Sequence, residues 1–519
     1  MNESKVWTED DYKTFNDNID SIPNCRIDED HFNMITYAEF YCMQDVNILR
    51  QSFNQFQKDF FKEFQINVYN ELTISGIANK YFRQQVYERN GNLYEVSGHV
   101  QHFIQKAVRG GRCMTAFNKK WHTKLDLSDF DAVSLYPSAM ARLYTVEGVP
   151  KVIQPDQLNM DFLSKQSAYV VEIKVTKVNK HFAFPLLVQK IDGLNVNDDH
   201  ITDPVTITID NIGLEDLINF QQIEFELIRG YYWDGKKDFK IQEVIKKIFN
   251  KRLEYKAMNN PLQELYKLIM NSCYGKTIQK PVKYDHRYVK ESDLSKYWYK
   301  NYYKIIECVK LANSDIYDVK IIKQINSQFN FSLLGVQILS MSKRIMNEVM
   351  CLAFDLGIKI FYQDTDSMHI EKDKIELLSN AFKEKYNREL IGKSLGQFHS
   401  DFEPINNHKE TPYAIESIFV AKKIYMDKLT DSSGDIGYHL RGKGITQQSI
   451  KALTSEKFNG DFVKTYESLF NEESLTFDLT AGQPSFAFSS DFTVSSRSEF
   501  LRKVKCSLPK GSVEDYFEN

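Results

Sequence analysis

The sequence predicts a mixed α/β (α+β) protein of several domains, on the basis of its length, composition and periodicity. The 519 residues correspond to about three and a half domains, at roughly 150 residues per domain. The hydrophobic fraction of 42% and the charged fraction of 26% are typical of a chain that folds throughout. Segments with the period of a helix alternate with segments with the period of a strand, which indicates a mixed fold.

Helices are expected in the first hundred residues, and strands follow them. Apolar residues recur at three- and four-residue steps over 34–64, which predicts one long helix, and a second helical stretch is expected near 72–86. Residues 100–133 read as short strands interrupted by Gly110-Gly111. Residues 150–235 are rich in β-branched side chains between turn dipeptides, which predicts strands and hairpins.

The second half of the chain changes period again. An amphipathic helix is expected around 241–248, and Asn260-Pro261 should open a second helix that ends near Tyr274. Residues 335–356 are helical in pattern, and 358–370 alternate as a hairpin does. Two helices joined at their tip are therefore expected, followed by a helix and a hairpin.

Charge and cysteine content limit the partners and the compartment. The formal net charge of −4 means that any nucleic acid must be held by local basic patches. The seven cysteines form no C-x-x-C pair, which argues against a zinc knuckle or a disulfide scaffold and favours a reducing, intracellular compartment. No signal-peptide pattern and no uninterrupted apolar stretch is found, so neither export nor a membrane partner is expected.

Two acidic motifs have the pattern of a metal site. In the first, a strand-like segment ends at Asp131 and is followed by a serine and a proline that can begin a helix. In the second, Asp364 and Asp366 lie two apart in a turn between apolar strands, so they share one face. Carboxylates on a rigid sheet suit Mg²⁺. Taken singly, each motif has a more common explanation, namely a solvated turn or a helix cap.

A third motif carries a cation, an amide and an aromatic ring. Lys267, Asn271 and Tyr274 share one face of a predicted helix whose other face carries Leu265, Leu268 and Ile269. A lysine for phosphates and a tyrosine for packing against sugar and base suit a nucleoside triphosphate. The alternative is the solvated stripe of a surface helix.

Together these motifs resemble those of a known family. The ordered set DxxSLYPS at 131–138, KxxxNSxYG at 267–275, YxDTDS at 362–367 and KxY at 423–425 closely resembles motifs A, B, C and KxY of the family B DNA polymerases. The SLYPS wording and the long segments 150–235 and 281–330 are most similar to the protein-primed branch of phages, adenoviruses, linear plasmids and mobile elements. The resemblance covers roughly residues 100–519.

The resemblance implies roles for the acidic residues. Asp131, Asp364 and Asp366 would be catalytic, with Asp131 and Asp366 as ligands of two Mg²⁺ ions and Mn²⁺ as an alternative metal. Asp364 would shape the field beside them. Tyr136 would lie under the incoming sugar and exclude a 2′ hydroxyl.

It also implies nucleotide and DNA contacts. Lys267 would bind the triphosphate, helped by Lys256 or Arg252, while Asn271 and Tyr274 would frame the nascent pair. Lys423 and Tyr425, two apart on one strand face, would hold the primer end.

By the same resemblance the chain would have a right-hand polymerase fold with palm, fingers and thumb. The expected division is a partial exonuclease-like region at 1–100, palm with a first inserted region at 101–239, fingers at 240–280, a second inserted region at 281–330, palm at 331–430 and thumb at 431–519. The second inserted region combines tyrosines and lysines, as nucleic-acid surfaces often do. A hairpin that packs these aromatics inward is the alternative.

Two motifs depart from the family pattern. Tyr41 and Asp45 resemble the third exonuclease motif, but too few residues precede them to supply the other carboxylates. Either the chain is a fragment or split product, or proofreading is lost and Asp45 is a surface residue. The family's YxGG/A loop would align with 108–111, where valine replaces the aromatic residue. Arg109 and Arg112 could still meet phosphates, and a plain glycine hairpin turn is the alternative.

The expected function is that of a DNA-directed DNA polymerase in the replication of a viral or linear plasmid-like genome. Its expected partners are template and primer DNA, deoxynucleoside triphosphates and a terminal-protein primer. A catalytically silent relative that binds DNA or terminal protein is the alternative, and the intact acidic triad speaks against it. Tyr136 favours deoxynucleotides over the substrates of an RNA polymerase.

Overall fold

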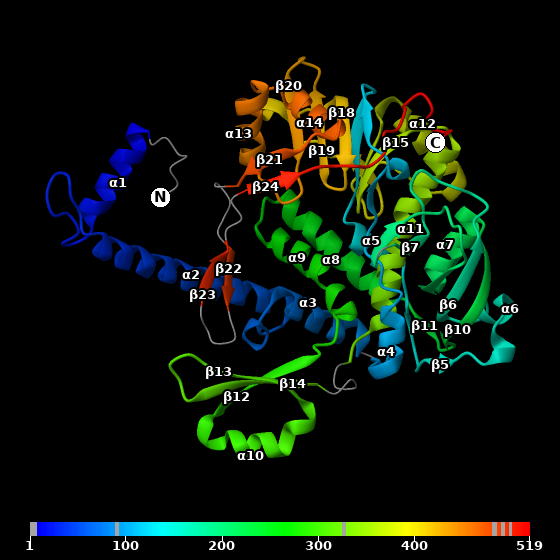
Figure 1. Cartoon of the computed structure of the whole chain (residues 1–519), viewed down its shortest axis with the longest axis horizontal. Coiled ribbons are helices and arrows are strands. Elements are labelled where there is room, and N and C mark those ends of the chain that lie inside the picture. Colours follow the sequence, from blue (N-terminus) through cyan, green and yellow to red (C-terminus); the bar gives the residue numbers. More distant parts are fainter. Residues whose placement is uncertain are drawn as a thin grey trace.

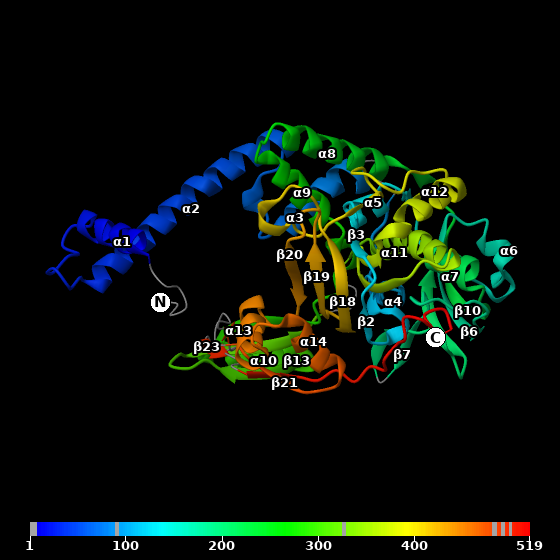
Figure 2. The same cartoon turned by 90° about the horizontal axis from the view of Figure 1, so that it is seen from above.

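The computed structural model describes residues 8–88, 93–191, 193–323, 329–479, 485–488, 494–497 and 501–518, with backbone alone for 485–488 and 494–497. Helices α1 (Glu9–Ser21) and α2 (Met34–Phe64) reach out from the body of the molecule (Figures 1 and 2). The predicted helix over 34–64 is thus confirmed. Only the last turns of α2, with Phe60 and Phe64, are buried against the rest of the chain. No helix of the described residues is long and apolar enough to cross a membrane.

Segments from both halves of the chain build the central sheet. Its strands pair antiparallel in the order β1-β15-β16-β3-β18-β19-β20, with β17 on β3 and β2 on β18. The strands are β1 (Cys113–Thr115), β2 (Trp121–Thr123), β3 (Leu127–Ala132), β15 (Ile360–Asp364), β16 (Ser367–Glu371), β17 (Phe398–Ser400), β18 (Tyr413–Ala421), β19 (Ile424–Thr430) and β20 (Ile436–Arg441).

Helices pack around this sheet and enclose the main hydrophobic core. The long helix α11 (Ser332–Asp355) is buried along most of its length and contacts both β15 and α5 (Leu135–Met140). Helix α12 (Ile375–Tyr386) packs on α11. The hairpin expected over 358–370 is β15–β16, and the helix expected over 335–356 is α11, so both predictions are confirmed.

Two helices joined at their tip stand beside the sheet, as the sequence predicts. Helix α8 (Lys240–Ala257) and helix α9 (Leu262–Ser272) pack on each other and on α5, and α9 also packs on α3 (Ile74–Phe82). The buried face of α9 carries Tyr266, Ile269, Met270 and Cys273. Leu268 was expected on that face but is 38% exposed.

Two side units have small sheets and cores of their own. The first side unit pairs strands in the order β5-β10-β6-β9, carries α6, α7 and the hairpin β7–β8, and matches the strands expected over 150–235. The second side unit pairs β12-β14-β13 with α10 against them, and lies at the bottom of Figure 1. Their elements are β5 (Lys151–Val152), α6 (Met160–Leu163), β6 (Ala168–Lys177), β7 (Val188–Ile191), β8 (Leu194–Asn197), β9 (Val205–Asp210), α7 (Asn211–Gln221), β10 (Glu224–Trp233), β12 (Tyr284–Lys290), α10 (Glu291–Asn301), β13 (Ile305–Lys310) and β14 (Ile316–Ile322).

The C-terminal unit begins later than expected. Strand β20 completes the central sheet, so the separate unit starts after it, with α13 (Gln447–Phe458), α14 (Phe462–Phe470), the pair β21 (Leu475–Asp478) and β24 (Leu501–Val504), and the pair β22 (Ser485–Phe488) and β23 (Val494–Arg497). The chain then returns to the sheet. The backbone at Lys510 forms a parallel β-bridge with Lys120, and the Tyr516 hydroxyl donates a hydrogen bond to the Ile360 carbonyl. The separate unit is therefore shorter than the span 431–519 at both ends, and the thumb itself stays a prediction.

The strands expected over 100–133 are only partly found. Helix α4 (Gly98–Gln105) begins this segment, and Gly110-Gly111 lie in a loop that leads into β1. Because β1 pairs with β15 and not with the preceding segment, the two glycines do not form a hairpin turn. The stretch near 72–86 is α3 followed by one π-helical turn over Arg83–Tyr87. A short pair, β4 (Thr145–Val146) and β11 (Lys237–Asp238), ties the ends of the first side unit together.

Candidate active site

Three aspartates meet where β3, β15 and β16 lie side by side. Asp131 near the end of β3 and Asp364 at the end of β15 are both opposite Ser367 in their ladders. The Ala132 amide donates to the Asp366 carbonyl at 2.8 Å. Since opposite residues of antiparallel strands lie about 4.5–5.5 Å apart, the sheet holds the three carboxylates in one cluster, as the sequence predicts.

The turn that carries Asp366 has an unusual backbone. Thr365 has φ of 61°, in the left-handed region that β-branched residues rarely adopt. Its amide donates to the Arg112 carbonyl at 2.8 Å, and the Asp366 amide donates to the Asp364 carbonyl at 2.7 Å. Gly111 packs against the turn, because a Cβ there would lie 2.6 Å from Thr365 Cγ2. The glycine loop and the acidic turn therefore fit together only without a side chain at 111.

The charges of the three aspartates are compensated unequally. Lys423 Nζ donates to both carboxylate oxygens of Asp364, at 2.9 and 3.1 Å. No ion pair is found for Asp131 or Asp366 within the described residues. Burial, and then the nearby Asp366, raises the pKa of Asp131 to about 8. Burial and Asp364 also raise the pKa of Asp366.

Asp131 and Asp366 therefore form a pair of carboxylates without an ion-pair partner in the part of the chain that the structure describes. Hard divalent cations such as Mg²⁺ prefer oxygen ligands of this kind, and a bound cation would favour the ionised form of both groups. The chemistry of the donor set thus fits a magnesium site. Asp364 already has a cationic partner, so it is the least suited of the three to be a direct ligand.

Further acidic residues surround this pair, and the sequence prediction missed them. Asp129 and Asp401 both contribute to the raised pKa of Asp131. Asp129 lies two residues before Asp131 on the same strand, so its position on the same face could have been predicted from spacing. Asp401 follows β17, and its approach depends on sheet pairing that no local pattern reveals.

A buried polar network lies deeper on the same face. His369 Nε2 and His439 Nδ1 both lie 3.1 Å from one oxygen of Asp427, whose other oxygen accepts from Ser417 Oγ at 2.6 Å. Burial would raise the pKa of Asp427, but the two histidines hold it well below its usual range. Burial would lower the pKa of His369, yet Asp427 and Asp129 raise it. The deep carboxylate is thus compensated, unlike the pair at the end of the strands.

Residues expected at a nucleotide lie next to the aspartates. The rings of Tyr136 and Tyr274 stack on each other, with centroids 4.2 Å apart and planes at 19°. Arg252 Nη1 donates to Ser134 Oγ at 3.4 Å, and its Nε is buried with no hydrogen-bond partner in the described structure. Ser134 itself lies between Asp131 and Tyr136, so the structure brings Arg252 to the site.

The remaining residues of this set lie on exposed surfaces of the helical pair. Lys267 and Asn271 are exposed on α9, where Lys267 Nζ lies 3.7 Å from Glu264 Oε2. Lys256 is exposed on α8, one turn beyond Arg252. These positions agree with the predicted face of the helix, but no described contact links them to the aspartates.

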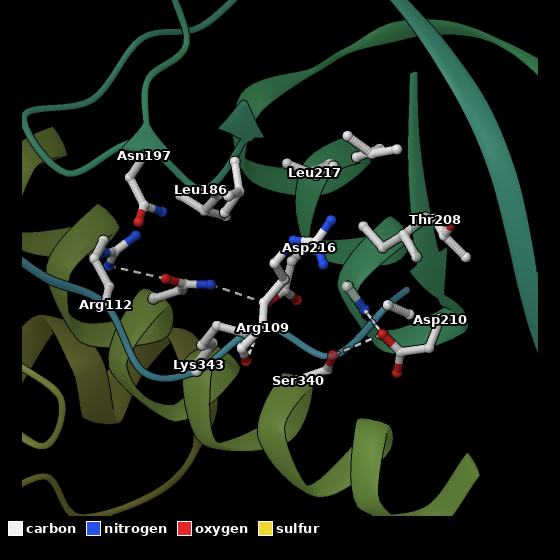
Figure 3. Close-up of a pocket in the computed structure, with 17 residues that line it drawn as sticks. Arg109, Arg112, Leu186, Asn197, Thr208, Asp210, Asp216, Leu217, Ser340 and Lys343 are labelled. Carbon is white, nitrogen blue, oxygen red and sulfur yellow. Dashed lines mark hydrogen bonds between the residues drawn. The ribbon is translucent and has the colours of Figure 1, made fainter. Parts of the chain in front are cut away.

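The prediction that Arg112 meets phosphates is wrong. Its guanidinium is buried and donates to the carbonyls of Phe184 and Pro185 and to Asn347 Oδ1, at 3.0 to 3.1 Å. Figure 3 shows Arg112 and Arg109 between α11 and the first side unit. Arg109 is half-buried and lines a cavity of about 70 Å³ there, where Nη1 donates to the Val108 carbonyl. Arg112 therefore joins the sheet to its neighbours and is not available to DNA.

Lys423 and Tyr425 do not share a strand face. Lys423 lies in the turn between β18 and β19 with φ of 61°, whereas Tyr425 is 5% exposed within β19. The Tyr425 ring packs on Tyr362 and His369. The expected geometry is wrong because the left-handed turn residue breaks the alternation of the strand. Lys423 reaches the acidic turn, and Tyr425 belongs to the layer beneath it.

The exonuclease-like residues Tyr41 and Asp45 lie on an exposed part of α2. Tyr41 is 58% exposed on α2 and stacks on Tyr37, and Asp45 is exposed one turn later. Neither cluster of histidine and acidic side chains found among the described residues includes Asp45. Asp45 is therefore part of no such ligand cluster in the part of the chain that the structure describes.

The aromatic residues of the second side unit point to solvent. Tyr299, Tyr302 and Tyr303 are 83%, 67% and 72% exposed, and Trp298 is 45% exposed. Tyr297 and Tyr317, by contrast, pack on the small core of the unit. The alternative of a hairpin that packs its aromatics inward is therefore wrong.

Comparisons with known proteins agree with this arrangement. Residues 4–351 match the family described as DNA polymerase type B, organellar and viral. A DNA polymerase of Kluyveromyces lactis is 25% identical over 380 residues, which are 71% of this chain and 36% of that protein. A probable DNA polymerase of Ascobolus immersus is 23% identical over 288 residues, 54% of this chain and 22% of that protein. The chain thus spans about a third or less of the length of these relatives.

Solved structures show the same fold. Phi29 DNA polymerase complexed with primer-template DNA and incoming nucleotide substrates gives a TM-score of 0.62 at 15% identity, over 92% of this chain and 73% of that one. The same enzyme with primer-template DNA alone gives 0.60 at 15% identity, over 86% and 70%. The central sheet with its surrounding helices is therefore an α/β polymerase fold.

The contact between Gly111 and Thr365 predicts a difference between neighbouring glycines. Gly111→Ala should displace the acidic turn and weaken Mn²⁺ binding by roughly tenfold or more, because small misplacements of a site have effects of this size. Gly110→Ala is the matched control, because a Cβ there meets nothing within 4 Å. Calorimetric titration with Mn²⁺ measures both, and equal affinities for the two variants would contradict the proposed contact.

Proposed function

The chain belongs to the organellar and viral type B DNA polymerases, and on this premise we propose that it is a DNA-directed DNA polymerase that adds deoxynucleotides to a primer hydroxyl. The observation that carries the proposal is the cluster of Asp131, Asp364 and Asp366 at the ends of paired strands. Such a cluster is what phosphoryl transfer by two metal ions needs. The expected setting is the replication of a viral or linear plasmid-like genome.

Asp131 and Asp366 are the residues that would hold the two Mg²⁺ ions, with Mn²⁺ as an alternative. Their raised pKa values, and the lack of an ion-pair partner for either among the described residues, support this choice. When bound, the ions would activate the attacking 3′ hydroxyl and stabilise the leaving pyrophosphate. Asp364, which is paired with Lys423, would orient that lysine and contribute to the electrostatic field at the ions.

The stacked rings of Tyr136 and Tyr274 support a nucleotide site beside the aspartates. Tyr136 would lie under the sugar and exclude a 2′ hydroxyl, and Tyr274 would frame the nascent pair together with Asn271. Arg252, whose Nε has no partner, would donate to the triphosphate. Exposed Lys256 and Lys267 would add charge to it from the two helices.

The parts of the fold can be named on this proposal. The central sheet would be the palm, α8 and α9 the fingers, and the C-terminal unit the thumb. The side units would be the two inserted regions, and the first would contact a terminal protein and DNA. The exposed tyrosines and tryptophan of α10 and of the turn after it, with neighbouring Lys300 and Lys304, would stack on bases and bind phosphates of a template strand.

For Tyr41 and Asp45 we infer no exonuclease site in this chain alone. Both are exposed on α2, and a two-metal site needs more carboxylates than Asp45 supplies. Incubation of the chain with single-stranded DNA and Mg²⁺ should leave the 3′ end intact, and robust trimming would overturn this inference.

Two assays distinguish this proposal from its alternatives. A silent relative that only binds DNA or terminal protein would bind a primer-template but not extend it. Protein priming would appear as covalent transfer of a deoxynucleotide to a candidate terminal protein, whereas oligonucleotide priming would extend DNA alone. Both assays use the same chain and the same Mg²⁺, so they can be run in parallel.

Asp366→Ala should reduce Mg²⁺-dependent primer extension by roughly 1000-fold, the scale of losing a preorganised electrostatic group. Retention of primer-template DNA should stay near the wild-type level, because Asp366 lies at the ions and not on a basic surface. The exposed Asp373 seven residues later gives the matched control Asp373→Ala, which should extend normally. Extension by Asp366→Ala at the control rate would remove the site assignment.

Tyr136→Ala should raise ribonucleotide incorporation roughly tenfold or more relative to deoxynucleotides, because the space for a 2′ hydroxyl opens. Tyr136→Phe keeps the ring stacked on Tyr274 and should preserve the discrimination. Primer extension with each nucleotide class gives the ratio of kcat/KM values for both variants. An unchanged ratio in Tyr136→Ala would rule out this residue as the sugar gate.

A further inference from the structure

A second group of metal-ligating side chains lies at the base of the hairpin β7–β8, in the first side unit. His181 precedes the hairpin, and Asp199 and His200 follow it. His181 Nδ1, Asp199 Oδ1 and His200 Nε2 all lie within 4.8 Å of one another. The carboxylate oxygen is 3.2 Å from His181 Nδ1 and 3.9 Å from His200 Nε2. One oxygen therefore faces both imidazoles.

The carboxylate of this group is fixed from behind. Asp199 is 1% exposed, and its Oδ2 accepts from the Phe182 amide at 3.1 Å and from Gln221 Nε2 at 2.7 Å. Gln221 is itself buried, and its Oε1 accepts from the amides of Leu186 and Leu187. Oδ2 is thus occupied, and Oδ1 is held toward the histidines. Such outer partners are what orient the ligands of metal sites.

The two histidines, by contrast, are exposed to solvent. Their side chains are 46% and 76% exposed, and their rings stack at 4.8 Å with planes at 8°. Because neither ring is buried, rotation of the side chains could bring the ring nitrogens to the roughly 2.0–2.1 Å that zinc requires. The open side toward solvent leaves room for water as a further ligand.

From this arrangement we propose that His181, Asp199 and His200 form a binding site for a divalent transition-metal ion, with Zn²⁺ as the best match. Two imidazoles and one carboxylate suit Zn²⁺, Co²⁺ and Ni²⁺, whereas Mg²⁺ prefers oxygen ligands alone. The site is therefore chemically distinct from the aspartate cluster of the central sheet. It also does not depend on the proposed polymerase activity.

The buried group of His369, Asp427 and His439 is not equivalent. There both imidazoles are hydrogen-bonded to one carboxylate oxygen, and His369 and Asp427 have no exposed surface. The hydrogen bonds and the burial leave no open side for an ion. That group is a buried hydrogen-bonded network, whereas at the hairpin Asp199 Oδ1 faces two exposed imidazoles.

An ion at the hairpin would join the two ends of the segment from 181 to 200. Through Gln221 it would also connect them to the end of α7, which packs on the core of the first side unit. Closing a loop in the folded state stabilises it against unfolding. The ion would thus cross-link the two ends of this segment and stabilise the first side unit.

The test uses the untagged full chain, freed of metal by a chelator and titrated with Zn²⁺ in excess Mg²⁺, so that the aspartate cluster is already occupied. We expect one Zn²⁺ per chain and a rise in Tm on binding. His181→Ala and His200→Ala should each weaken binding by roughly 100-fold, since even outer partners contribute about 10–100-fold. The double variant should lose both the binding and the rise in Tm.

Two controls make the outcome decisive. His102→Ala removes an exposed histidine of α4 and should bind Zn²⁺ as the wild type does. Asp366→Asn should also leave Zn²⁺ affinity unchanged, because that residue belongs to the other cluster. Zn²⁺ binding that survives in the double histidine variant, or the lack of any binding by the wild type, would overturn the proposal.

Discussion

The electrostatic repulsion between Asp131 and Asp366 is the constraint on which the rest of the site depends. Two carboxylates that are partly buried and close together destabilise each other when both are ionised. A flexible chain would separate them. Here the ladder between β3 and β16, and the hydrogen bond from Ala132 to Asp366, hold them in place. The rigidity of the central sheet is thus a requirement of the site and not only of the fold.

Among the described residues, two aspartates near this pair have cationic partners, unlike the pair itself. Deep in the sheet, Asp427 is compensated by His369 and His439, and at the surface Asp364 is compensated by Lys423. Within the described residues, Asp131 and Asp366 form no ion pair, whereas Lys423, His369 and His439 are engaged by other carboxylates. The attraction for an added divalent ion is therefore concentrated at this pair. The buried cation Arg112 contributes through its carbonyl, which supports the turn, rather than through its charge.

Local spacing was sufficient to predict the main elements, and the three aspartates followed from spacing together with the resemblance to the family B motifs. Asp131, Asp364 and Asp366 stand at strand ends or turns that alternation and turn chemistry indicate, and α2, α8, α9 and α11 follow from helical periodicity. Arg112 could not be assigned, because its partners at 184, 185 and 347 are distant in sequence. Lys423 was placed on a strand because no pattern reveals a left-handed residue in a two-residue turn. The pairing of β20 and the return of the C-terminal segment likewise depend on tertiary contacts.

The order of strands in the central sheet has a consequence for how this protein folds during its synthesis on the ribosome. Strand β3 is made early, yet the neighbours that pair with it, β16, β17 and β18, are encoded after the side units and α11. Non-local pairing of this kind slows folding and leaves strand edges exposed during synthesis. The strands of the side units pair within short stretches of sequence. These units can therefore fold first and cover β3 until its partners have been made. Folding of the central sheet is therefore expected to be a late, cooperative step that joins segments far apart in the sequence.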